Sequence, residues 1–570
     1  MNPALDMTAP TPAELEAILA ERLGLSESAK NDFLYPKYEL GDPFLFADME
    51  PAVARLHQAV VGGEQIGIYA DYDCDGIPAA VILLDLFKVL GIKDRVHVYI
   101  PDRHEEGYGV SAQGIGELAQ AGVTLMITVD VGITALAEIA DAQSQGIDCI
   151  VTDHHTPIAK SSGKPDYPAA LAVVHPVKGE YPCTDLCGAG VAFTLVRGFL
   201  SKHRAEFGVV DGWEKWLLDM AGFATLSDMV PLVGENRKLA AYGLTVMRKT
   251  RRVGLRSLFA ANGLYLDRLT ESDLTFTVAP RLNAASRMDS PMLAFRLLAT
   301  DDRIEAEQIA RRLEEINADR KLLVARIVKD AHARLDKRTH SQELSDIVVI
   351  GDLSWRPAVL GLVANKLQET YERSFFVWGG NGGEVLKGSC RMQSLHHAAK
   401  LFQDLPEGLL VNAGGHQAAG GFSVTKEKVH FLEEELNSAL ARSLVQADAD
   451  RASEDIDALA EATGAIPASL AIATARHYAV IRRFAPFGVG NCEPEFLFEN
   501  VTVMSAKKFG KAKEHLECTV ADETGTAIAF TFFATPALES KIIPGERVTF
   551  AATIEPGWKS GMRLRIRKVH

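Results

Sequence analysis

The sequence predicts an α/β protein in which a parallel-sheet domain comes first, followed by a long connecting helix, a second α/β domain and a small all-β barrel. Three observations support this order. Short apolar runs alternate with helical patterns between about residues 56 and 235, charged residues fill 303–334 without Pro or Gly, and β-branched and aromatic residues dominate from about residue 494. Alternation of strands with helices is typical of βαβ units and a parallel sheet.

The first domain begins with a buried strand at 65–70 (QIGIYA). A helix follows at 77–90, and it is apolar on most sides, as a helix against a sheet would be. Three β-rich runs and two helical patterns continue the alternation, at 96–100, 125–129 and 149–152 for the strands and at 112–121 and 135–145 for the helices.

The charged pattern at 303–334 exceeds the length of an ordinary globular helix, which indicates a spacer between domains. The run 346–350 (DIVVI) then restarts an α/β pattern that continues to about residue 440. The acidic, Ala-rich stretch 446–461 is predicted to be a surface helix or a linker. The short strands and Gly-containing turns after it favour a small barrel.

Composition excludes several classes of protein. The chain has 570 residues, 47% of them apolar, with 60 Lys+Arg against 75 Asp+Glu and a net charge of −15, which excludes disordered, collagen-like and membrane-bundle proteins. Seven cysteines make no disulfide framework, so a reduced, cytoplasmic location is expected. We find neither a signal-peptide pattern nor an apolar run of ~20 residues that could span a bilayer.

Carboxylates gather where the first strand ends. Asp71, Asp73 and Asp75 alternate in DYDCDG, and three acids at that spacing repel one another unless a cation lies among them. A calcium loop of the EF-hand type is rejected, because Ile82 takes the place of its Glu ligand and a strand precedes it. Capping of the next helix would explain one of the three acids but not all of them.

Three more acidic sites follow later runs: Asp130, the triplet Asp153-His154-His155, and Asp228 in ATLSDMVPL. We expect all four sites at the carboxyl ends of strands in one sheet, where ligands of open α/β folds bind. Carboxylates mixed with imidazole suit Mn²⁺ or Mg²⁺, and several shared Asp residues favour two metal ions. Phosphoester hydrolysis is therefore the reaction that the residues favour.

In this order the four sites resemble the motifs of the DHH phosphoesterase superfamily. The stretch 411–422 (VNAGGHQAAGGF) resembles the glycine-histidine motif of the associated DHHA1 domain. Together with 279–288, 354–367, 388–392 and 486–496, the set is similar to the bacterial single-strand-specific exonucleases of that superfamily, from about residue 40 onward.

The resemblance implies a 5′-to-3′ exonuclease that degrades single-stranded DNA to mononucleotides in recombination and repair, with two divalent ions, Mn²⁺ or Mg²⁺. It implies an N-terminal extension at 1–55, a DHH catalytic domain at 56–300, a connecting helix at 301–340, a DHHA1 domain at 341–445, a helical linker at 446–493 and an OB-like domain at 494–570. The implied metal ligands are Asp73, Asp75, Asp130, His154 and Asp228, and the implied catalytic residues are His155, Asp71 and Asp153.

The resemblance also implies residues that bind the DNA strand. Arg103, Ser389 and Arg391 would hold its 5′ phosphate, since a guanidinium matches phosphate oxygens. The remaining implied substrate-binding residues are Arg281, Arg287, Gly414, Gly415 and His416. Surface ion pairs for the arginines, and a tight turn for the glycine pair, are the alternatives.

The barrel carries its own basic residues, and residues 501–570 have a net charge of +4 from 11 Lys+Arg and 7 Asp+Glu. Lys507, Lys508 and Lys511 cluster near Phe509, and the alternating Arg563, Arg565 and Arg567 share one face of a strand. Such a face with aromatic residues suits single-stranded nucleic acid, and an OB-fold is the expected form. A merely solvated basic face is the alternative.

Two competing functions stay open at this point. A DHH phosphoesterase acting on short oligonucleotides, cyclic dinucleotides or pyrophosphate would use the same metal chemistry, but it would leave the long helix and the barrel unexplained. A catalytically inactive DNA-binding protein is the other, although every expected ligand is present. Under the favoured interpretation the partners are single-stranded DNA and, as candidates, a RecQ-type helicase and a single-strand-binding protein, with no membrane and a monomeric state.

Overall fold

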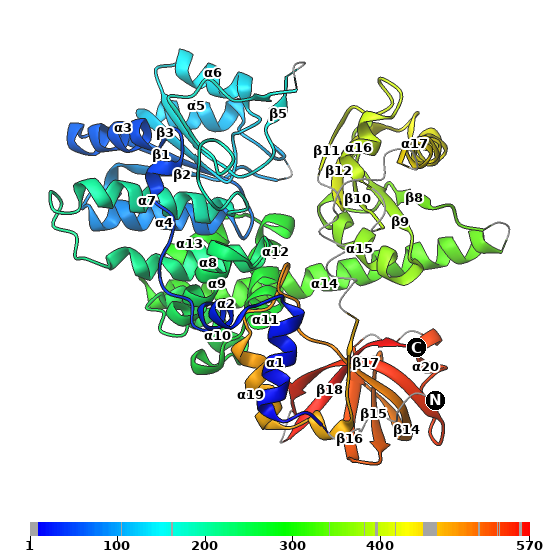
Figure 1. The fold of residues 1–570 in the computed structure, drawn as a ribbon. Helices are drawn as coiled ribbons and strands as arrows, with labels where there is room; N and C mark the ends of the chain where they lie inside the picture. Colours follow the sequence, from blue (N-terminus) through cyan, green and yellow to red (C-terminus); the bar gives the residue numbers. More distant parts are fainter. Residues whose placement is uncertain are drawn as a thin grey trace.

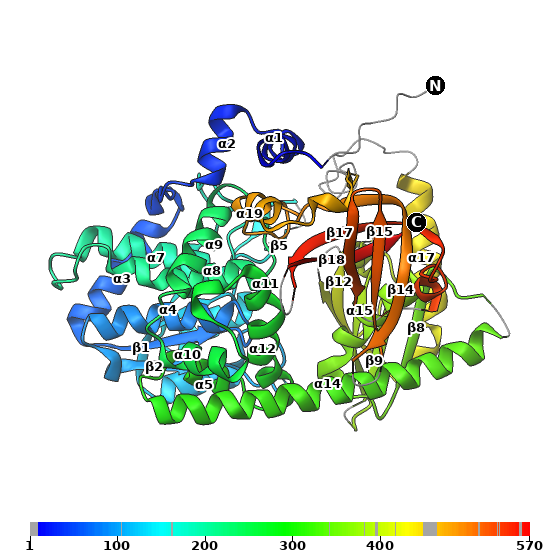
Figure 2. The same cartoon turned by 90° about the horizontal axis from the view of Figure 1, so that it is seen from below.

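The computed structural model describes residues 9–103, 105–160, 163–340, 343–380, 382–393, 397–415, 418–447, 464–510, 513–532, 534, 536–557 and 561–570. Most of the predicted helix or linker at 446–461 lies outside these residues. Two α/β lobes stand side by side on one long helix, and the barrel lies against them on another side (Figures 1 and 2).

The first lobe is built on a parallel five-stranded sheet with the strand order β2-β1-β3-β4-β7. Its strands are β1 (Gln65–Ala70), β2 (Val96–Tyr99), β3 (Val123–Val129), β4 (Asp148–Thr152) and β7 (Ala172–Val174). The predicted strands at 65–70, 96–100, 125–129 and 149–152 are confirmed, with ends that differ by at most two residues. These runs are mostly apolar because helices cover both faces of the sheet.

Two helical layers enclose this sheet (Figure 1). On one face lie α5 (Ala112–Gln120) and α6 (Leu136–Ser144), and on the other α3 (Met49–Gly62), α4 (Gly76–Val89) and α7 (Gly188–His203). Eleven residues of α4 are buried, because it is sandwiched between the sheet and further helices. This position explains why the predicted helix at 77–90 is apolar on most sides.

A helical layer completes the lobe with α8 (Leu218–Ser227), α9 (Gly234–Met247), α10 (Val253–Ala261), α11 (Glu271–Asp273), α12 (Ala279–Met288) and α13 (Met292–Ala299). The prediction that Asp228 follows a strand is wrong, because it caps the C-terminus of helix α8. All residues of α8 up to Leu226 are buried, so its apolar sequence resembles that of a buried strand. Periodicity cannot separate the two when a segment is short and buried on all sides.

Helix α14 (Arg303–Thr339) confirms the predicted spacer and runs beneath both α/β lobes (Figures 1 and 2). The second lobe has a mixed sheet in the order β11-β12-β10-β9-β8, with only β8 and β9 parallel. Its strands are β8 (Ile347–Asp352), β9 (Ser374–Gly379), β10 (Val385–Arg391), β11 (Asn412–Gly415) and β12 (Ala419–Thr425), and its helices are α15 (Leu360–Tyr371), α16 (Ala398–Gln403) and α17 (Leu432–Ala447).

The C-terminal barrel closes through the pairing of β14 with β17. Its five strands are β14 (Phe496–Phe509), β15 (His515–Asp522), β16 (Gly525–Thr531), β17 (Arg547–Pro556) and β18 (Met562–Val569), while β13 (Ile466–Pro467) extends one edge and α20 (Pro536–Glu539) connects β16 to β17. Leu15 and Leu19 of α1 (Pro12–Arg22) pack in the same core, beside α19 (Ala475–Arg483). A second N-terminal helix, α2 (Glu27–Leu34), follows.

The predicted fold class is therefore confirmed in all four parts: parallel-sheet lobe, long helix, second α/β lobe and terminal barrel. All seven cysteines are free thiols, as their count and spacing predict. Within the described residues, none of the helices has the length and apolar character needed to cross a bilayer.

Candidate active site

Three acidic sites lie along one edge of the first sheet. Asp71, Asp130 and Asp153 each follow directly after β1, β3 or β4, which are neighbouring parallel strands. Parallel strands end at the same edge, so residues that are distant in sequence meet there. The predicted gathering of these three strand-end carboxylates is confirmed.

His154 lies at the centre of this group. Its Nε2 is 3.2 Å from a carboxylate oxygen of Asp130, 3.6 Å from one of Asp75 and 3.8 Å from one of Asp228. Two sets of side chains, Asp75-His154-Asp228 and Asp130-His154-His155, each bring three ligand atoms within 4.8 Å of one another, as does Asp71-Asp73-Asp130. Although Asp228 comes from a helix end, it reaches the same place as the strand-end acids.

Backbone amides hold two of the acids in position. Asp73 accepts hydrogen bonds from the N–H groups of Asp75 (2.8 Å) and Gly76 (3.1 Å), so the capping role that was an alternative for one of the three acids belongs to Asp73. Asp75 accepts from the N–H groups of Gly188 (2.5 Å) and Ala189 (2.7 Å), at the N-terminus of α7. These contacts orient carboxylates before any ligand binds.

Unusual backbone geometry brings the acids close together. Asp130 has a φ of 60°, in the left-handed region that few residues other than glycine adopt. A Cβ atom at Gly188 would lie 2.5 Å from the Cβ of Asp130, and one at Gly76 would lie 2.5 Å from the carbonyl oxygen of Asp71. Only glycine therefore fits at these two positions.

The electrostatics of the cluster fit a bound cation. Burial, followed by repulsion from neighbouring acids, raises the pKa of Asp71, Asp130 and Asp228 well above the ordinary range. Burial also raises the pKa of Asp75, although His154 opposes it. One buried oxygen of Asp71 accepts no hydrogen bond from the described residues, and the corresponding oxygen of Asp130 has only the imidazole contacts, the nearest being His154 at 3.2 Å. Buried, repelling carboxylates with so few partners are the ligand set that a hard divalent cation would neutralise.

Asp153 plays a different part from the other acids. Its carboxylate accepts from the N–H groups of Ile133, His154 and His155, and from Nδ1 of His155 at 2.8 Å. Burial alone would raise the pKa of Asp153, but the hydrogen bond and the charge of His155 lower it to about 2. Burial opposes protonation of His155, yet Asp153 and the nearby acids raise its pKa to about 9. Asp153 therefore orients a protonated imidazole at the edge of the cluster.

Cationic side chains gather beside the acids from both lobes. We call Arg103, Arg287, Arg320 and Arg391 the arginine cluster. Arg103 lies 4.9 Å from the ring centre of Tyr72, the residue between Asp71 and Asp73 in the sequence. Burial first, and then the charges of the other three arginines, lower the pKa of Arg287 to about 9. Mutually repelling guanidinium groups of this kind favour a bound anion.

Ser389 occupies the same face of β10 as Arg391 and so borders this cluster. A Cβ atom at Gly361, in the first turn of α15, would lie 3.7 Å from the Oγ of Ser389 and equally far from Nη2 of Arg391. The positive end of the α15 dipole therefore lies next to both side chains. Arg281 differs, because it pairs with Glu314 and donates to the carbonyl oxygen of Thr277 at 2.6 Å.

The glycine pair and His416 belong to a hairpin of the second lobe. Gly414 and Gly415 of β11 pair with Gly421 and Gly420 of β12. A Cβ atom at Gly415 would lie 2.4 Å from the carbonyl oxygen of Ala419, whereas Gly414 faces open space. The close approach at Gly415 is thus made by the hairpin itself, and His416 lies outside the described residues.

The barrel arginines share one strand, as their alternation predicts. Arg563 lies 4.0 Å from the ring centre of Phe530, and Arg565 lies 5.3 Å from that of Phe532. Both contact Glu555 at 3.5 Å, and Arg567 contacts Glu493 at 3.3 Å.

The barrel lysines point to different partners. Lys507 pairs with Glu517 at 2.7 Å and Lys508 with Glu539 at 2.8 Å, while Lys511 lies outside the described residues. The basic faces are therefore partly neutralised by glutamates that come from other strands and from α20.

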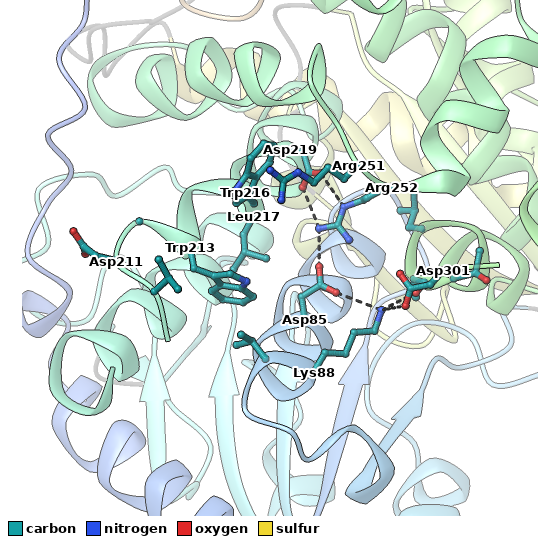
Figure 3. Close-up of a pocket in the computed structure, with 16 residues that line it drawn as sticks. Asp85, Lys88, Asp211, Trp213, Trp216, Leu217, Asp219, Arg251, Arg252 and Asp301 are labelled. Carbon is teal, nitrogen blue, oxygen red and sulfur yellow. Dashed lines mark hydrogen bonds and ion pairs between the residues drawn. The ribbon is translucent and has the colours of Figure 1, made fainter. Parts of the chain in front are cut away.

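A cavity of about 640 Å³ opens at the far end of α4 from the acids (Figure 3). Its wall holds an ion-pair chain in which Arg252 bridges Asp85 and Asp219, and Lys88 bridges Asp85 and Asp301. Because these charges neutralise one another, the cavity presents no unsatisfied cluster like the one at the sheet edge. We assign the reaction to the sheet edge and not to this cavity.

Several residues of the site escaped the sequence analysis. Tyr108 directs its hydroxyl to both ring nitrogens of His155 at 3.3 Å, and it lies in the same segment as Arg103. Gly188 and Ala189 bind the carboxylate of Asp75, although they are 113 and 114 residues away in the sequence. The glycine-rich sequence CGAG at 187–190 is the one local signal that could have indicated this contact. Arg320 could not be singled out from the sequence, because α14 contains many other charged residues.

Comparison with known families divides the chain into three matched parts. Residues 65–221 match the N-terminal domain of the DHH family, residues 319–442 match the DHHA1 domain, and residues 466–566 match the RecJ OB domain.

Curated relatives and solved structures agree with these matches. RecJ of Bacillus subtilis is 32% identical over 95% of this chain, which spans 65% of that protein's length, and RecJ of Escherichia coli is 30% identical over 75% of this chain and 76% of its own. The crystal structure of Thermus thermophilus RecJ with Mn²⁺ has a TM-score of 0.77 and 25% identity, covering 98% of this chain and 76% of that one. The chain belongs to the RecJ family of single-stranded-DNA-specific exonucleases, within the DHH phosphoesterases.

Proposed function

We propose that this protein hydrolyses single-stranded DNA from the 5′ end to mononucleotides, using two divalent ions, in recombination and repair. The observation that carries the proposal is the meeting of His154 with Asp75, Asp130 and Asp228, all within 3.8 Å, from separate segments of the chain. Relatives of the family have been solved with Mn²⁺ and with Mg²⁺, which fits the carboxylate-rich ligand set.

The residues that would hold the two ions are Asp73, Asp75, Asp130, His154 and Asp228, with Asp71 beside them. When bound, such ions supply positive charge at the scissile phosphate and acidify an attacking water. The chain contributes the positioning: the amides of Gly188 and Ala189 fix Asp75, and the amides after Asp73 fix that carboxylate. Fixed ligands spare the site from reorganising during the reaction.

His155 would donate a hydrogen bond from a protonated ring nitrogen to the phosphate. Its Nδ1 is held by Asp153 at 2.8 Å, and, although burial opposes protonation, the hydrogen bond and charge of Asp153 raise the pKa of His155, which favours the protonated ring. The other ring nitrogen is then a donor for a phosphate oxygen that gains negative charge in the transition state. Tyr108 restricts the orientation of the ring through its hydroxyl.

The arginine cluster, with Ser389, is the proposed site for the 5′ phosphate. A terminal phosphate carries more negative charge than an internal one, so a buried set of guanidinium groups selects strand ends. Arg287 holds its place by donating to the carbonyl oxygen of Ala358 at 3.0 Å. We give Arg281 no direct contact with the phosphate, because it already pairs with Glu314.

We assign the parts of the chain accordingly. Residues 56–300 carry the reaction, 301–340 connect the lobes, 341–445 contribute Ser389, Arg391, Gly414, Gly415 and His416, and 494–570 bind the strand through the barrel. Residues 1–55 and 446–493 are the extension and the linker. A RecQ-type helicase, a single-strand-binding protein, a monomeric state and a cytoplasmic location stay predictions.

The substrate class is tested by comparing a long 5′-phosphorylated single strand with the same strand bearing a 5′ hydroxyl and with a dinucleotide. We expect mononucleotides to be released from the 5′ end and the phosphorylated strand to be cleaved fastest. The variant Arg391→Ala should raise KM for the phosphorylated strand by roughly 10- to 100-fold, since removing a hydrogen bond to a charged group costs about 1.5–3 kcal/mol.

Arg373→Ala is the matched control, because Arg373 is in the same lobe and its ion pair with Asp346 is exposed. A preference for the dinucleotide would instead support a small-substrate DHH phosphoesterase. Equal KM values for the two long strands in the parent protein would remove the 5′-phosphate site from the proposal.

The role of the barrel is tested by the salt dependence of binding. The triple variant Arg563→Gln, Arg565→Gln, Arg567→Gln should weaken binding of a long strand and flatten the slope of log K against log salt by up to ~2, at ~0.7 for each phosphate that is no longer neutralised. Glu555 and Glu493 already pair with these arginines. The slope change of ~2 is therefore an upper limit, which is reached only if all three arginines leave their glutamates to contact phosphates. An unchanged slope would place the barrel outside the binding path.

A further inference from the structure

A second group of metal-ligating side chains lies outside the acidic cluster. His57 of α3 places its Nε2 2.9 and 2.8 Å from the two carboxylate oxygens of Glu206. His203, the last residue of α7, places its Nδ1 3.1 Å from the same carboxylate. All three ligand atoms lie within 4.8 Å of one another.

The two imidazoles are arranged in parallel. Their ring centres are 3.9 Å apart and their planes differ by 13°, so one nitrogen of each ring faces the shared carboxylate. Ligand atoms on one zinc ion, ~2.0–2.2 Å from the metal in a tetrahedral arrangement, lie ~3.3–3.6 Å apart. The carboxylate is 2.8–3.1 Å from the two nitrogens, at hydrogen-bond distance, so a small outward movement of these side chains would make room for an ion.

The surroundings of the group support ligand binding and not only a surface hydrogen bond. The rings of Phe199 and Phe207 pack behind the two histidines, with ring centres 5.2 Å from His203 and 6.1 Å from His57. The side chains of His57 and His203 are 29% and 20% exposed, so both are partly buried yet reachable by an ion. Two helices that are packed against each other supply the histidines, and Glu206 lies in the turn directly after α7.

We propose that His57, His203 and Glu206 form a zinc site with one position open to water. Two imidazoles and one carboxylate suit Zn²⁺, whereas Mn²⁺ and Mg²⁺ prefer the carboxylate-rich cluster at the sheet edge. The site lies at the C-terminal end of α7, about 24 Å along that 16-residue helix from the amides that hold Asp75. It is thus separate from the proposed catalytic residues.

The bound ion would act as a clip between α3 and α7. These helices cover the same face of the parallel sheet, and α7 positions Asp75 through its first turn. An ion that binds only the folded arrangement stabilises it by an amount that grows with the logarithm of the ratio of its concentration to Kd. The site therefore contributes to stability and not to the chemical step.

The test is a zinc titration of the full-length protein by calorimetry and by metal analysis after gel filtration. The parent should bind one equivalent more Zn²⁺ than His57→Ala or Glu206→Gln, and its melting temperature should rise by several degrees more on adding Zn²⁺. His430→Ala is the control, because His430 is exposed and lies in the other lobe. Cleavage with Mn²⁺ should be equal in all four proteins.

Glu206→Gln guards against misfolding, because Glu206 is exposed and its amide analogue keeps the shape of the side chain. Co²⁺ gives a second readout, since a site with two imidazole ligands should add a visible absorption band that both variants lose. Equal zinc stoichiometry and equal thermal shifts in the parent and the two variants would overturn the proposal.

Discussion

At the scale of single residues, the site is built from groups that are costly without a ligand. Asp71 and Asp130 are buried, repel each other's charge and have raised pKa values. Asp130 also adopts a left-handed backbone conformation. Proteins keep such features where they serve binding or catalysis. Each acid therefore lowers the stability of the metal-free protein and raises the affinity of the site for cations.

The substitution Asp130→Asn tests both consequences. Asn keeps the shape and tolerates the left-handed region, so folding should persist and the metal-free melting temperature should rise, because one repelling charge is removed. Turnover with saturating Mn²⁺ should fall by at least ~100-fold, more than is typical for loss of a supporting contact. Scanning calorimetry with and without Mn²⁺, beside a nuclease assay, measures both effects.

Asp141→Asn is the matched control, since Asp141 is an exposed acid on α6 of the same lobe. It should leave turnover and the response to Mn²⁺ unchanged. Near-normal cleavage by the Asp130→Asn variant at saturating Mn²⁺ would show that Asp130 is not a ligand.

Sequence patterns could predict Asp71, Asp130 and Asp153, because each follows a buried apolar run and strand ends share an edge. The same pattern wrongly predicted that Asp228 follows a strand, because the buried helix α8 before it is as apolar as a buried strand. The amides of Gly188 that hold Asp75 could not be predicted, because nothing local encodes a contact across 113 residues.

At the scale of elements, helix α4 connects the catalytic edge to the opposite side of its lobe. Asp75 and Gly76 begin the helix, and Asp85 and Lys88 near its end join the ion-pair chain of the Figure 3 cavity. Arg252 closes this chain through Asp85 at 2.7 Å and Asp219 at 2.8 Å. Burial raises the pKa of Asp219 although Arg252 opposes it, so that acid depends on its partner.

Arg252→Met should therefore destabilise the first lobe strongly. Removing one member of a buried pair leaves an uncompensated charge and costs about 3–5 kcal/mol. Chemical denaturation followed by circular dichroism measures this loss, while turnover below the transition should stay normal, since Arg252 contacts α4 at Asp85, about 15 Å along the helix from Asp75.

Arg251→Met provides the comparison, because Arg251 is exposed and stacks on Trp216 at 4.0 Å (Figure 3). Its loss should cost only about 0.5–1 kcal/mol. Similar losses for the two variants would mean that Arg252 is not the member that holds this chain together.

Element prediction succeeded where one periodicity dominated. The predicted spacer at 303–334 is α14, which extends five residues further to Thr339, because its last turns still bury Leu335 beneath the second lobe. The shared face of Arg563 and Arg565 followed from alternation alone, whereas the pairing of β17 with β18 shifts register at Arg567. Their partner Glu555 did not follow from it, since it depends on the register between β17 and β18, which places Glu555 opposite Arg563.

At the scale of the whole molecule, buried polar contacts tie the barrel region to the first lobe. Arg237 of α9 donates to the carbonyl oxygens of Phe484 (3.0 Å) and Ala485 (3.1 Å), in the segment between α19 and the barrel. Glu271 of α11 forms a two-pronged pair with Arg482 of α19, at 2.7 and 2.8 Å. These contacts fix the segment that leads into the barrel against the first lobe.

The pair between Glu271 and Arg482 makes this attachment depend on pH. Burial would raise the pKa of Glu271, but the hydrogen bonds and the charge of Arg482 lower it below its ordinary value. A carboxylate with a lowered pKa stabilises the folded state above its unfolded pKa of ~4.3, and this contribution is lost as pH falls through the folded pKa. Acid should therefore loosen the attachment of the barrel region.

Glu271→Gln should lower the stability of this attachment at pH 7 by about 3 kcal/mol, near the lower limit for breaking a buried pair, because Arg482 is 22% exposed. Hydrogen exchange of α19 and of the segment 484–491 reports on the attachment itself, whether or not the lobes unfold together. The difference between variant and parent should shrink below about pH 4, where the parent also protonates Glu271. Glu16→Gln is the control, because Glu16 pairs with the more exposed Arg483 and should change exchange by under ~1 kcal/mol. A difference that stays constant from pH 7 down to pH 3 would show that packing, and not the charge of Glu271, holds the barrel region in place.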